Sequence, residues 1–270
     1  MYEVIFKVKI FIIKYLEKLT LKNNWIFSTM FFCTLISLFF AFPSYDSIDP
    51  NVGRLKLFLI QSNSITEFWK NYNYTNLSYR ITVPLFLNII GGGFISSLII
   101  RHIIGIILFG FCSKIIFNLT RDRVSALLYS LILALSVPGF TSFCEYRGNF
   151  DGIALFFIVL SFYFKNPFIV VCCLVFGFFT DERTLFSVGF LLVYEILSSQ
   201  YKNNHHRRFL NLNNISILAA LFIYVFFRFW IYSEYQINVE EVLQISNGWI
   251  LLGQINNIPL AMWTGLEGFW

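Results

Sequence analysis

Ionisable side chains interrupt the apolar runs of this sequence at a few points, and the most compact interruption is Thr180-Asp181-Glu182-Arg183. It separates two runs with almost no polar residues, 167–179 and 184–196. Three adjacent ionisable residues at the centre of a bilayer would cost about 2.5–3.5 kcal/mol each. We therefore expect this segment to form a turn at a membrane surface or to line a polar cavity.

Arginine and carboxylate side chains recur at similar interruptions elsewhere. Arginine binds phosphate oxygens through its planar guanidinium, which can donate two parallel hydrogen bonds. A carboxylate beside it can act as a general base or ligate a divalent cation. The candidate phosphate-binding residues are Arg80, Arg147 and Arg183, and the candidates beside them are Asp46, Asp49, Tyr79, Glu145, Asp151, Asp181 and Glu182. These residue types indicate a site for an anion such as a phosphate or pyrophosphate; Mg²⁺ or Mn²⁺ would suit the carboxylates, although no ligand spacing requires a metal.

The same residues have simpler structural interpretations. Asp46 and Asp49 could be solvated loop residues, and the Arg80 side chain could extend to a membrane interface. An ion-paired turn would account for the charges at 145–151. Thr180 or Asp181 could cap a following helix while the neighbouring charges pair with each other. Both kinds of interpretation stay open at the level of sequence.

The composition indicates the molecular class. Of 270 residues, 57% are hydrophobic and 13% are charged, whereas soluble domains carry about 25% charged residues. The mean hydropathy is +0.67. We therefore expect an all-α fold, a polytopic transmembrane bundle of about seven spans with interfacial and re-entrant helices. The net charge of +5 comes from basic residues scattered between apolar runs, which is typical of membrane topology signals and not of nucleic-acid binding.

The N-terminal half is expected to start in the cytoplasm. Residues 1–24 carry spaced lysines and predict a basic amphipathic helix on the cytoplasmic membrane surface. The elements expected next are a first span at 25–42, an outer loop at 44–80 with interfacial helices at 55–60 and 65–69, a re-entrant or interfacial piece at 81–90, a glycine break at 91–93 and a long span at 94–117. Two spans within 79–117 are the alternative. Arg101 and His102 fall inside the long span, where an ionisable pair marks either a function or a misplaced helix end.

The spans of the C-terminal half are expected to cross the membrane in alternating directions. Its expected spans are 124–141, 152–164, 168–179, 185–197 and 215–232. The transmembrane domain, 25–232, places the protein in the cell (inner or plasma) membrane as a multi-pass protein. Residues 233–270 are expected to form an outer or interfacial tail and an incomplete C-terminus.

This topology brings every candidate residue to the outer face of the membrane. The positive-inside rule disfavours arginine on that face. Three candidate arginines are nevertheless present there, and each has an acidic or aromatic residue close by in the sequence. The pattern favours an outer site that handles an anion.

The layout of the chain, with Asp46 and Asp49 directly after the first span and interfacial helices after them, resembles polytopic membrane glycosyltransferases of the class called GT-C. Three short strings resemble bacterial membrane proteins of similar layout that are uncharacterised. The strings are Tyr79-Arg80-Ile81-Thr82-Val83-Pro84-Leu85, Gly148-Asn149-Phe150-Asp151 and Thr180-Asp181-Glu182-Arg183. The resemblance covers about residues 25–232 and implies an enzyme that uses a lipid-linked sugar donor on the outer side. Acidic catalytic residues of the class lie early in the first outer loop, which implies a catalytic role for Asp46 and Asp49. Many members have adjacent acidic residues there, whereas two residues separate the pair in this chain.

The leading hypothesis is a glycosyltransferase that moves a sugar from a polyprenyl-phosphate donor to a glycan or lipid acceptor. Asp46 or Asp49 would deprotonate the acceptor hydroxyl, the three arginines would hold the donor phosphate, and the other candidates would orient them or the acceptor. One alternative is a transporter or flippase for a lipid-linked or anionic solute. A second alternative is a non-catalytic membrane scaffold in polysaccharide assembly, in which the charges only pair with one another.

Overall fold

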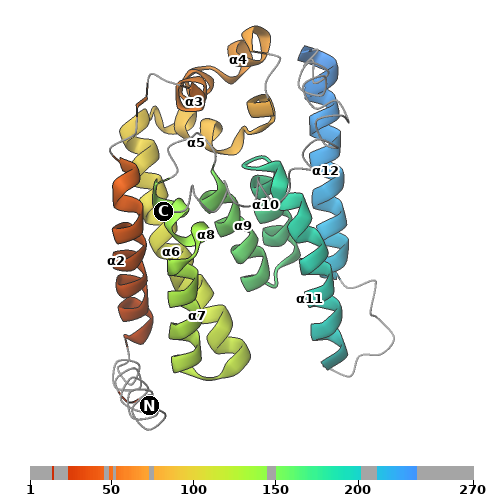
Figure 1. Cartoon of the computed structure of the whole chain (residues 1–270). Coiled ribbons are helices and arrows are strands. Elements are labelled where there is room, and N and C mark those ends of the chain that lie inside the picture. Colours follow the sequence, from red (N-terminus) through yellow and green to blue (C-terminus); the bar gives the residue numbers. More distant parts are fainter. Residues whose placement is uncertain are drawn as a thin grey trace, which may run out of the picture.

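The computed structural model describes residues 24–45, 49–50, 53–72, 76–144, 150–201 and 212–235, together with Lys14. All regular structure in these ranges is helical, as the composition predicts, and no strand occurs in them. The elements are α2 (Trp25–Tyr45), α3 (Gly53–Asn63), α4 (Ile65–Asn71), η1 (Asn76–Tyr79), α5 (Thr82–Ile90), α6 (Phe94–Thr120), α7 (Arg123–Leu135), α8 (Val137–Cys144), α9 (Asp151–Tyr163), α10 (Pro167–Phe178), η2 (Glu182–Phe186), α11 (Ser187–Tyr201) and α12 (Leu212–Tyr235). Figure 1 shows α3, α4 and α5 gathered at one end of the bundle, which we call the first-loop end.

Three helices of the described chain, α2, α6 and α12, are long and apolar enough to cross a membrane. Their surfaces expose large apolar side chains, including Phe39 on α2 and Phe222 on α12, as expected for helices that contact lipid. Helices α7, α9 and α10 are also apolar, but they have only 13, 13 and 12 residues. The fold is therefore an all-helical bundle compatible with a membrane.

The first-loop end contains the short helices that the sequence predicts, each a few residues longer than expected. The Trp69 Nε1–H donates to the Ser78 carbonyl at 2.7 Å, and Gln61 Nε2 donates to the Leu77 carbonyl at 3.1 Å. These two bonds hold η1 against α3 and α4. They thereby fix the segment that leads into Arg80.

The glycine break and the long helix after it are also confirmed. Gly91 caps α5 with a left-handed backbone, φ 62°, a conformation that glycine adopts without steric cost. After this break α6 runs without interruption, and Arg101 lies well inside it. The ionisable pair at Arg101 and His102 therefore does not mark a misplaced helix end.

The predicted single span at 124–141 is instead two helices. Helix α7 ends at Leu135 and α8 begins at Val137, with Ser136 in an extended conformation between them. Pro138 explains the break, because proline has no backbone N–H with which to continue the hydrogen-bond ladder of α7, whereas it is tolerated in the first turn of α8. The segment thus has a corner where the sequence pattern indicated continuous helix.

The short helices α9 and α10 form a hairpin whose turn lies between the predicted spans 152–164 and 168–179. The Asn166 side chain accepts a hydrogen bond from the Phe168 backbone N–H at 3.0 Å, and Pro167 occupies the first helical position, where proline is favoured. At its other end α9 crosses α8 closely, and a Cβ atom on Gly152 would overlap the Ser142 backbone. The α8 corner and the hairpin together position the start of α9.

Packing around Phe150 joins this start to the rest of the bundle. Phe150 belongs to a buried cluster with Phe58 of α3 and Leu87 of α5, and the Phe58 and Phe150 ring centroids are 4.5 Å apart. The guanidinium of Arg101 in α6 lies over the Phe150 ring at 4.6 Å. Three elements therefore fix the residue directly before Asp151.

Candidate functional site

Asp181 is the buried anchor of a charged cluster at the first-loop end. It follows α10 and caps η2, accepting a hydrogen bond from the Arg183 backbone N–H at 2.9 Å. The Arg183 side chain also binds it, with Nε donating to Oδ1 at 3.0 Å and Nη2 donating to Oδ2 at 2.7 Å. The structural interpretation of this segment as a helix cap is therefore confirmed for Asp181.

Arg80 approaches the same carboxylate from the first-loop side. Its Nη1 lies 3.4 Å from Asp181 Oδ2. The position depends on Thr82, whose hydroxyl donates to the Phe176 carbonyl at 2.8 Å and whose backbone N–H donates to the Phe179 carbonyl at 3.2 Å. The start of α5 is thus tied to the end of α10, which brings Arg80 and Asp181 together.

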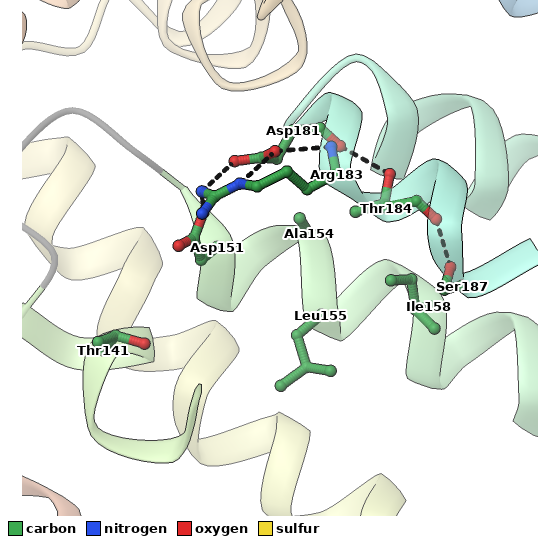
Figure 2. Close-up of a pocket in the computed structure, with 9 residues that line it drawn as sticks. All are labelled: Thr141, Asp151, Ala154, Leu155, Ile158, Asp181, Arg183, Thr184 and Ser187. Atoms are coloured by element: carbon green, nitrogen blue, oxygen red, sulfur yellow. Dashed lines mark hydrogen bonds and ion pairs between the residues drawn. The ribbon is translucent and has the colours of Figure 1, made fainter. Parts of the chain in front are cut away.

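Asp151 completes the cluster from the N-terminus of α9. Arg183 Nη2 bridges the two carboxylates, because it also forms an ion pair with Asp151 Oδ1. The side chains of Arg183 and Asp151 are 57% and 38% exposed, whereas that of Asp181 is 2% exposed. Figure 2 shows the guanidinium lying between the two carboxylates.

The two carboxyl groups have opposite pKa shifts. Burial would raise the pKa of Asp181, but hydrogen bonds from Arg183 and the charge of Arg80 outweigh it and lower the pKa to about 2. Asp151 precedes the apolar part of α9. Burial and the nearby Asp181 raise its pKa to about 6, although Arg183 acts in the opposite direction. The helix dipole stabilises an ionised carboxylate at a helix N-terminus by only about 0.3–1 kcal/mol. This is too little to prevent the increase in the pKa of Asp151.

A cavity of about 280 Å³ opens beside the cluster. Its surface is mostly apolar, and its lining residues are Thr141, Asp151, Ala154, Leu155, Ile158, Asp181, Arg183, Thr184 and Ser187. Figure 2 shows Arg183 and the two carboxylates together, with Leu155 and Ile158 farther along α9. This volume suits a small head group rather than a whole drug-sized ligand, whose sites measure about 300–1,000 Å³.

A second charged cluster lies next to the first and includes a residue that sequence analysis missed. Arg228 of α12 donates from Nη1 to Glu182 at 2.9 Å and to the Tyr224 hydroxyl at 2.6 Å. Its guanidinium also lies over the Tyr79 ring at 4.3 Å. The signal in the sequence was that Arg228 is a single cation inside the apolar run 215–232. Placing a charge in such a run costs free energy, which an acidic or polar partner can offset.

The structure brings together six of the ten predicted site residues. These are Tyr79, Arg80, Asp151, Asp181, Glu182 and Arg183. Asp49 is exposed and is not among the residues that line the cavity. The other three predicted residues, Asp46, Glu145 and Arg147, lie outside the described residues.

Among the residues that the structure describes, no group of three or more His, Cys, Asp or Glu side chains is arranged to hold a metal ion. The two carboxylates of the cavity instead share a guanidinium. What they can do chemically is present a cation to an anionic ligand and accept or release a proton.

Comparisons of the chain with protein-family models, curated proteins and solved structures found no match. Its function therefore has to be inferred from the chemistry of the Asp151–Arg183–Asp181 cluster and from the helices that carry it.

Proposed function

We propose that the protein is an integral membrane glycosyltransferase of GT-C-like architecture. It transfers a sugar from a polyprenyl-phosphate donor to a glycan or lipid acceptor on the outer face of the membrane. The main support is Arg183, a cation held by two carboxylates at the edge of an apolar cavity. A cation beside a mostly apolar surface suits a head group that is anionic and attached to a lipid.

The proposal includes the topology. The N-terminus is cytoplasmic, about seven helices cross the membrane, and the first-loop end faces outward. The turn at 164–166 and the link between α6 and α7 then face the cytoplasm. Asp151 and Asp181 lie at the outer ends of α9 and α10, where an aqueous acceptor and a lipid-linked donor can both reach them.

Each charged group has a chemical task in this proposal. Asp46 or Asp49 takes the proton from the acceptor hydroxyl as its oxygen attacks the anomeric carbon of the donor sugar. The bond from that carbon to the phosphate oxygen breaks, and negative charge increases on the departing polyprenyl phosphate. Arg183 stabilises this charge, with Arg147 as a second donor, and the low dielectric of the cavity strengthens the interaction. Arg80 acts through Asp181, which it helps to keep ionised.

The test uses the full chain purified in lipid nanodiscs. It is incubated with a panel of polyprenyl-phosphate hexoses and pentoses together with a cell-envelope extract that supplies glycan and lipid acceptors. Release of polyprenyl phosphate is measured by mass spectrometry, so the acceptor does not have to be identified beforehand. Wild-type protein is expected to release it from one donor. The variant with both Asp46→Ala and Asp49→Ala should lose release by about 100-fold or more, as expected when a general base is removed.

The matched control is Asp122→Asn, which keeps a good helix cap at an exposed acidic residue before α7 and should retain wild-type release. Full activity in the double variant would refute the assignment of the base. No release by the wild-type protein from any donor of the panel would refute the transferase.

A transporter for an anionic solute is the second candidate, and Arg101 favours it. This arginine is 3% exposed within α6, one of the three helices able to span a membrane, and buried ionisable groups in spans often line solute pathways. A transporter would move solute in response to an ion gradient, and Arg101→Gln would abolish movement. Donor cleavage that needs no gradient would exclude this candidate.

If neither activity occurs and reversed charges at Glu182 and Arg228 are tolerated, the protein is a scaffold.

A further inference from the structure

The two carboxylates bound to Arg183 are held to different degrees. Asp181 receives three hydrogen bonds from Arg183, one of them from the backbone, and it also contacts Arg80. Asp151 pairs with Nη2 of the same guanidinium but with no backbone group of the turn in the described chain, and its side chain is far more exposed than that of Asp181. Of the two contacts, only the Asp151 contact can be exchanged without dismantling the turn.

An entering oxyanion would meet this exchangeable contact first. Within the described chain, the hydrogen bonds of the Arg183 side chain use Nε and Nη2, and none uses Nη1. The guanidinium lines the cavity together with Asp151. Two parallel bonds to an oxyanion need a second nitrogen beside Nη1, and Nη2 becomes available when Asp151 leaves it.

We propose that Asp151 competes with the anionic ligand for Arg183: a phosphate- or sulfate-type oxyanion replaces the Asp151 carboxylate on the guanidinium, and Asp151 takes up one proton from solvent. The inference rests on the proposed function only for placing a lipid phosphate at Arg183. It deepens that function by making ligand binding depend on pH.

The charges that face Asp151 explain why a proton is taken up. From η2 it faces Arg183 and the adjacent Asp181, and Arg80 lies on the far side of Asp181. From α6, Arg101 contacts the ring of the neighbouring Phe150. Helices α8 and α10 contribute no charged side chain. Once the oxyanion occupies Arg183, Asp151 lies between two anions, and like charges disfavour its ionised form.

The state without ligand already approaches this condition. Burial and Asp181 raise the pKa of Asp151 to about 6 while Arg183 still binds it. Below that pH Asp151 is neutral and its ion pair with Arg183 is lost, so a ligand no longer has to displace an ionised carboxylate from the guanidinium. Binding should therefore weaken as pH rises above about 6.

The experiment measures proton uptake directly in the full chain in nanodiscs. Inorganic sulfate and octyl sulfate serve as probes, because neither changes its charge near neutral pH and they separate a free oxyanion from one attached to an apolar chain. Calorimetric titration at about pH 7 in two buffers of different ionisation enthalpy gives the number of protons taken up, which should approach about one. Affinity should fall about tenfold for each pH unit above about pH 6.

The variants assign this proton. Asp151→Asn should abolish proton uptake, remove the pH dependence and tighten binding about tenfold at about pH 7. Arg183→Gln should abolish binding, and the control Asp122→Asn should behave as wild type. Tighter binding of octyl sulfate than of sulfate would support a lipid head group as the ligand, and equal binding would support a free oxyanion.

Binding by wild type without proton uptake would overturn the inference and leave the transferase untouched. Unchanged binding in Arg183→Gln would also overturn it, since the oxyanion would then bind elsewhere. The wild-type proton count needs no variant, so a poorly folded variant cannot hide the answer. Proton-coupled binding together with no donor cleavage would uphold the inference and refute the transferase.

Discussion

The charged cluster shows how burial gives two groups of the same chemical type, the carboxyl groups of Asp181 and Asp151, different ionisation behaviour. Asp181 is buried, capped by its own turn and near two arginines, so it stays ionised and acts as the anchor of the cluster. Asp151 is half-exposed at the end of a helix and is more easily protonated. The difference follows from position alone, since both side chains are aspartates bound to one arginine.

At this scale we predict unequal costs for removing the two carboxylates. Asp181→Ala leaves Arg80 and Arg183 near each other without their shared anion. Breaking a buried ion pair costs about 3–5 kcal/mol. We expect a loss of stability near the lower end of that range, because solvent screens the half-exposed Arg183. Asp151→Ala should cost at most about 1 kcal/mol. Unfolding in mixed micelles, followed by tryptophan fluorescence, measures both. Equal losses would mean that Asp151 is as much an anchor as Asp181.

At the scale of elements, the sequence predicts helices where apolar runs end in glycine, proline or a charged turn. The start of α2 at Trp25, the break at Gly91 and the turn before Pro167 follow from these signals. The corner at Ser136 was missed because apolar residues continue through it, although Pro138 signals the break.

The candidate site was predictable for a related reason. Asp151 and Asp181 lie at equal sequence distances on either side of Asn166, so a hairpin at that turn must bring them together. Two features could not be deduced in this way. The partner of Arg228 depends on how α12 lies against η2. The unequal exposure of the two aspartates depends on tertiary packing, which the sequence pattern does not indicate.

The crossing of α8 and α9 provides a prediction at the element scale. Gly152→Ala would place a methyl group against the Ser142 backbone and should destabilise the bundle by about 1–3 kcal/mol, the usual cost of overpacking. It should also tighten sulfate binding at about pH 7, because Asp151, which competes with sulfate for Arg183, moves with α9. The matched control is Gly189→Ala in α11, where a methyl group meets no atom within 4 Å. That control should gain up to about 1 kcal/mol, since alanine favours helix more than glycine does.

The measurement is again unfolding in mixed micelles, with sulfate affinity as a second observable. A Gly152→Ala protein as stable as the Gly189→Ala protein would show that α8 and α9 tolerate a wider separation. In that case the close crossing would not be what positions Asp151.

For the whole molecule, the arrangement of the helices predicts two chemically different ends. The first-loop end carries α3, α4 and α5, and the opposite end of the α9–α10 hairpin carries the turn at 164–166 (Figure 1). The charged cluster lies toward the first-loop end, because Arg80 before α5 contacts Asp181. Lys165 lies beside that turn and pairs with Glu195 at 3.3 Å. If the basic N-terminal segment is cytoplasmic, the two ends have to face opposite compartments.

Cysteine labelling tests this orientation in intact cells. Lys70→Cys in α4 and Asn166→Cys in the hairpin turn both replace exposed polar residues. A membrane-impermeant maleimide should label the first variant in intact cells and the second only after the membrane is opened. The reverse pattern would place the charged cluster in the cytoplasm and exclude an outer-face transferase. The parent protein with no added cysteine provides the background, since the described native cysteines Cys33, Cys112, Cys172 and Cys173 are buried or half-buried.

The shortness of the α9–α10 hairpin has a consequence for the membrane itself. At 1.5 Å per residue, helices of this length reach about 20 Å, whereas the hydrocarbon core of a bilayer is about 30 Å thick. If the hairpin crosses the membrane, as we propose, the lipids beside it have to thin to relieve the hydrophobic mismatch. This dimple would lower the layer of lipid head groups toward Asp151 and Arg183, so that a lipid phosphate could reach the cavity without leaving its leaflet.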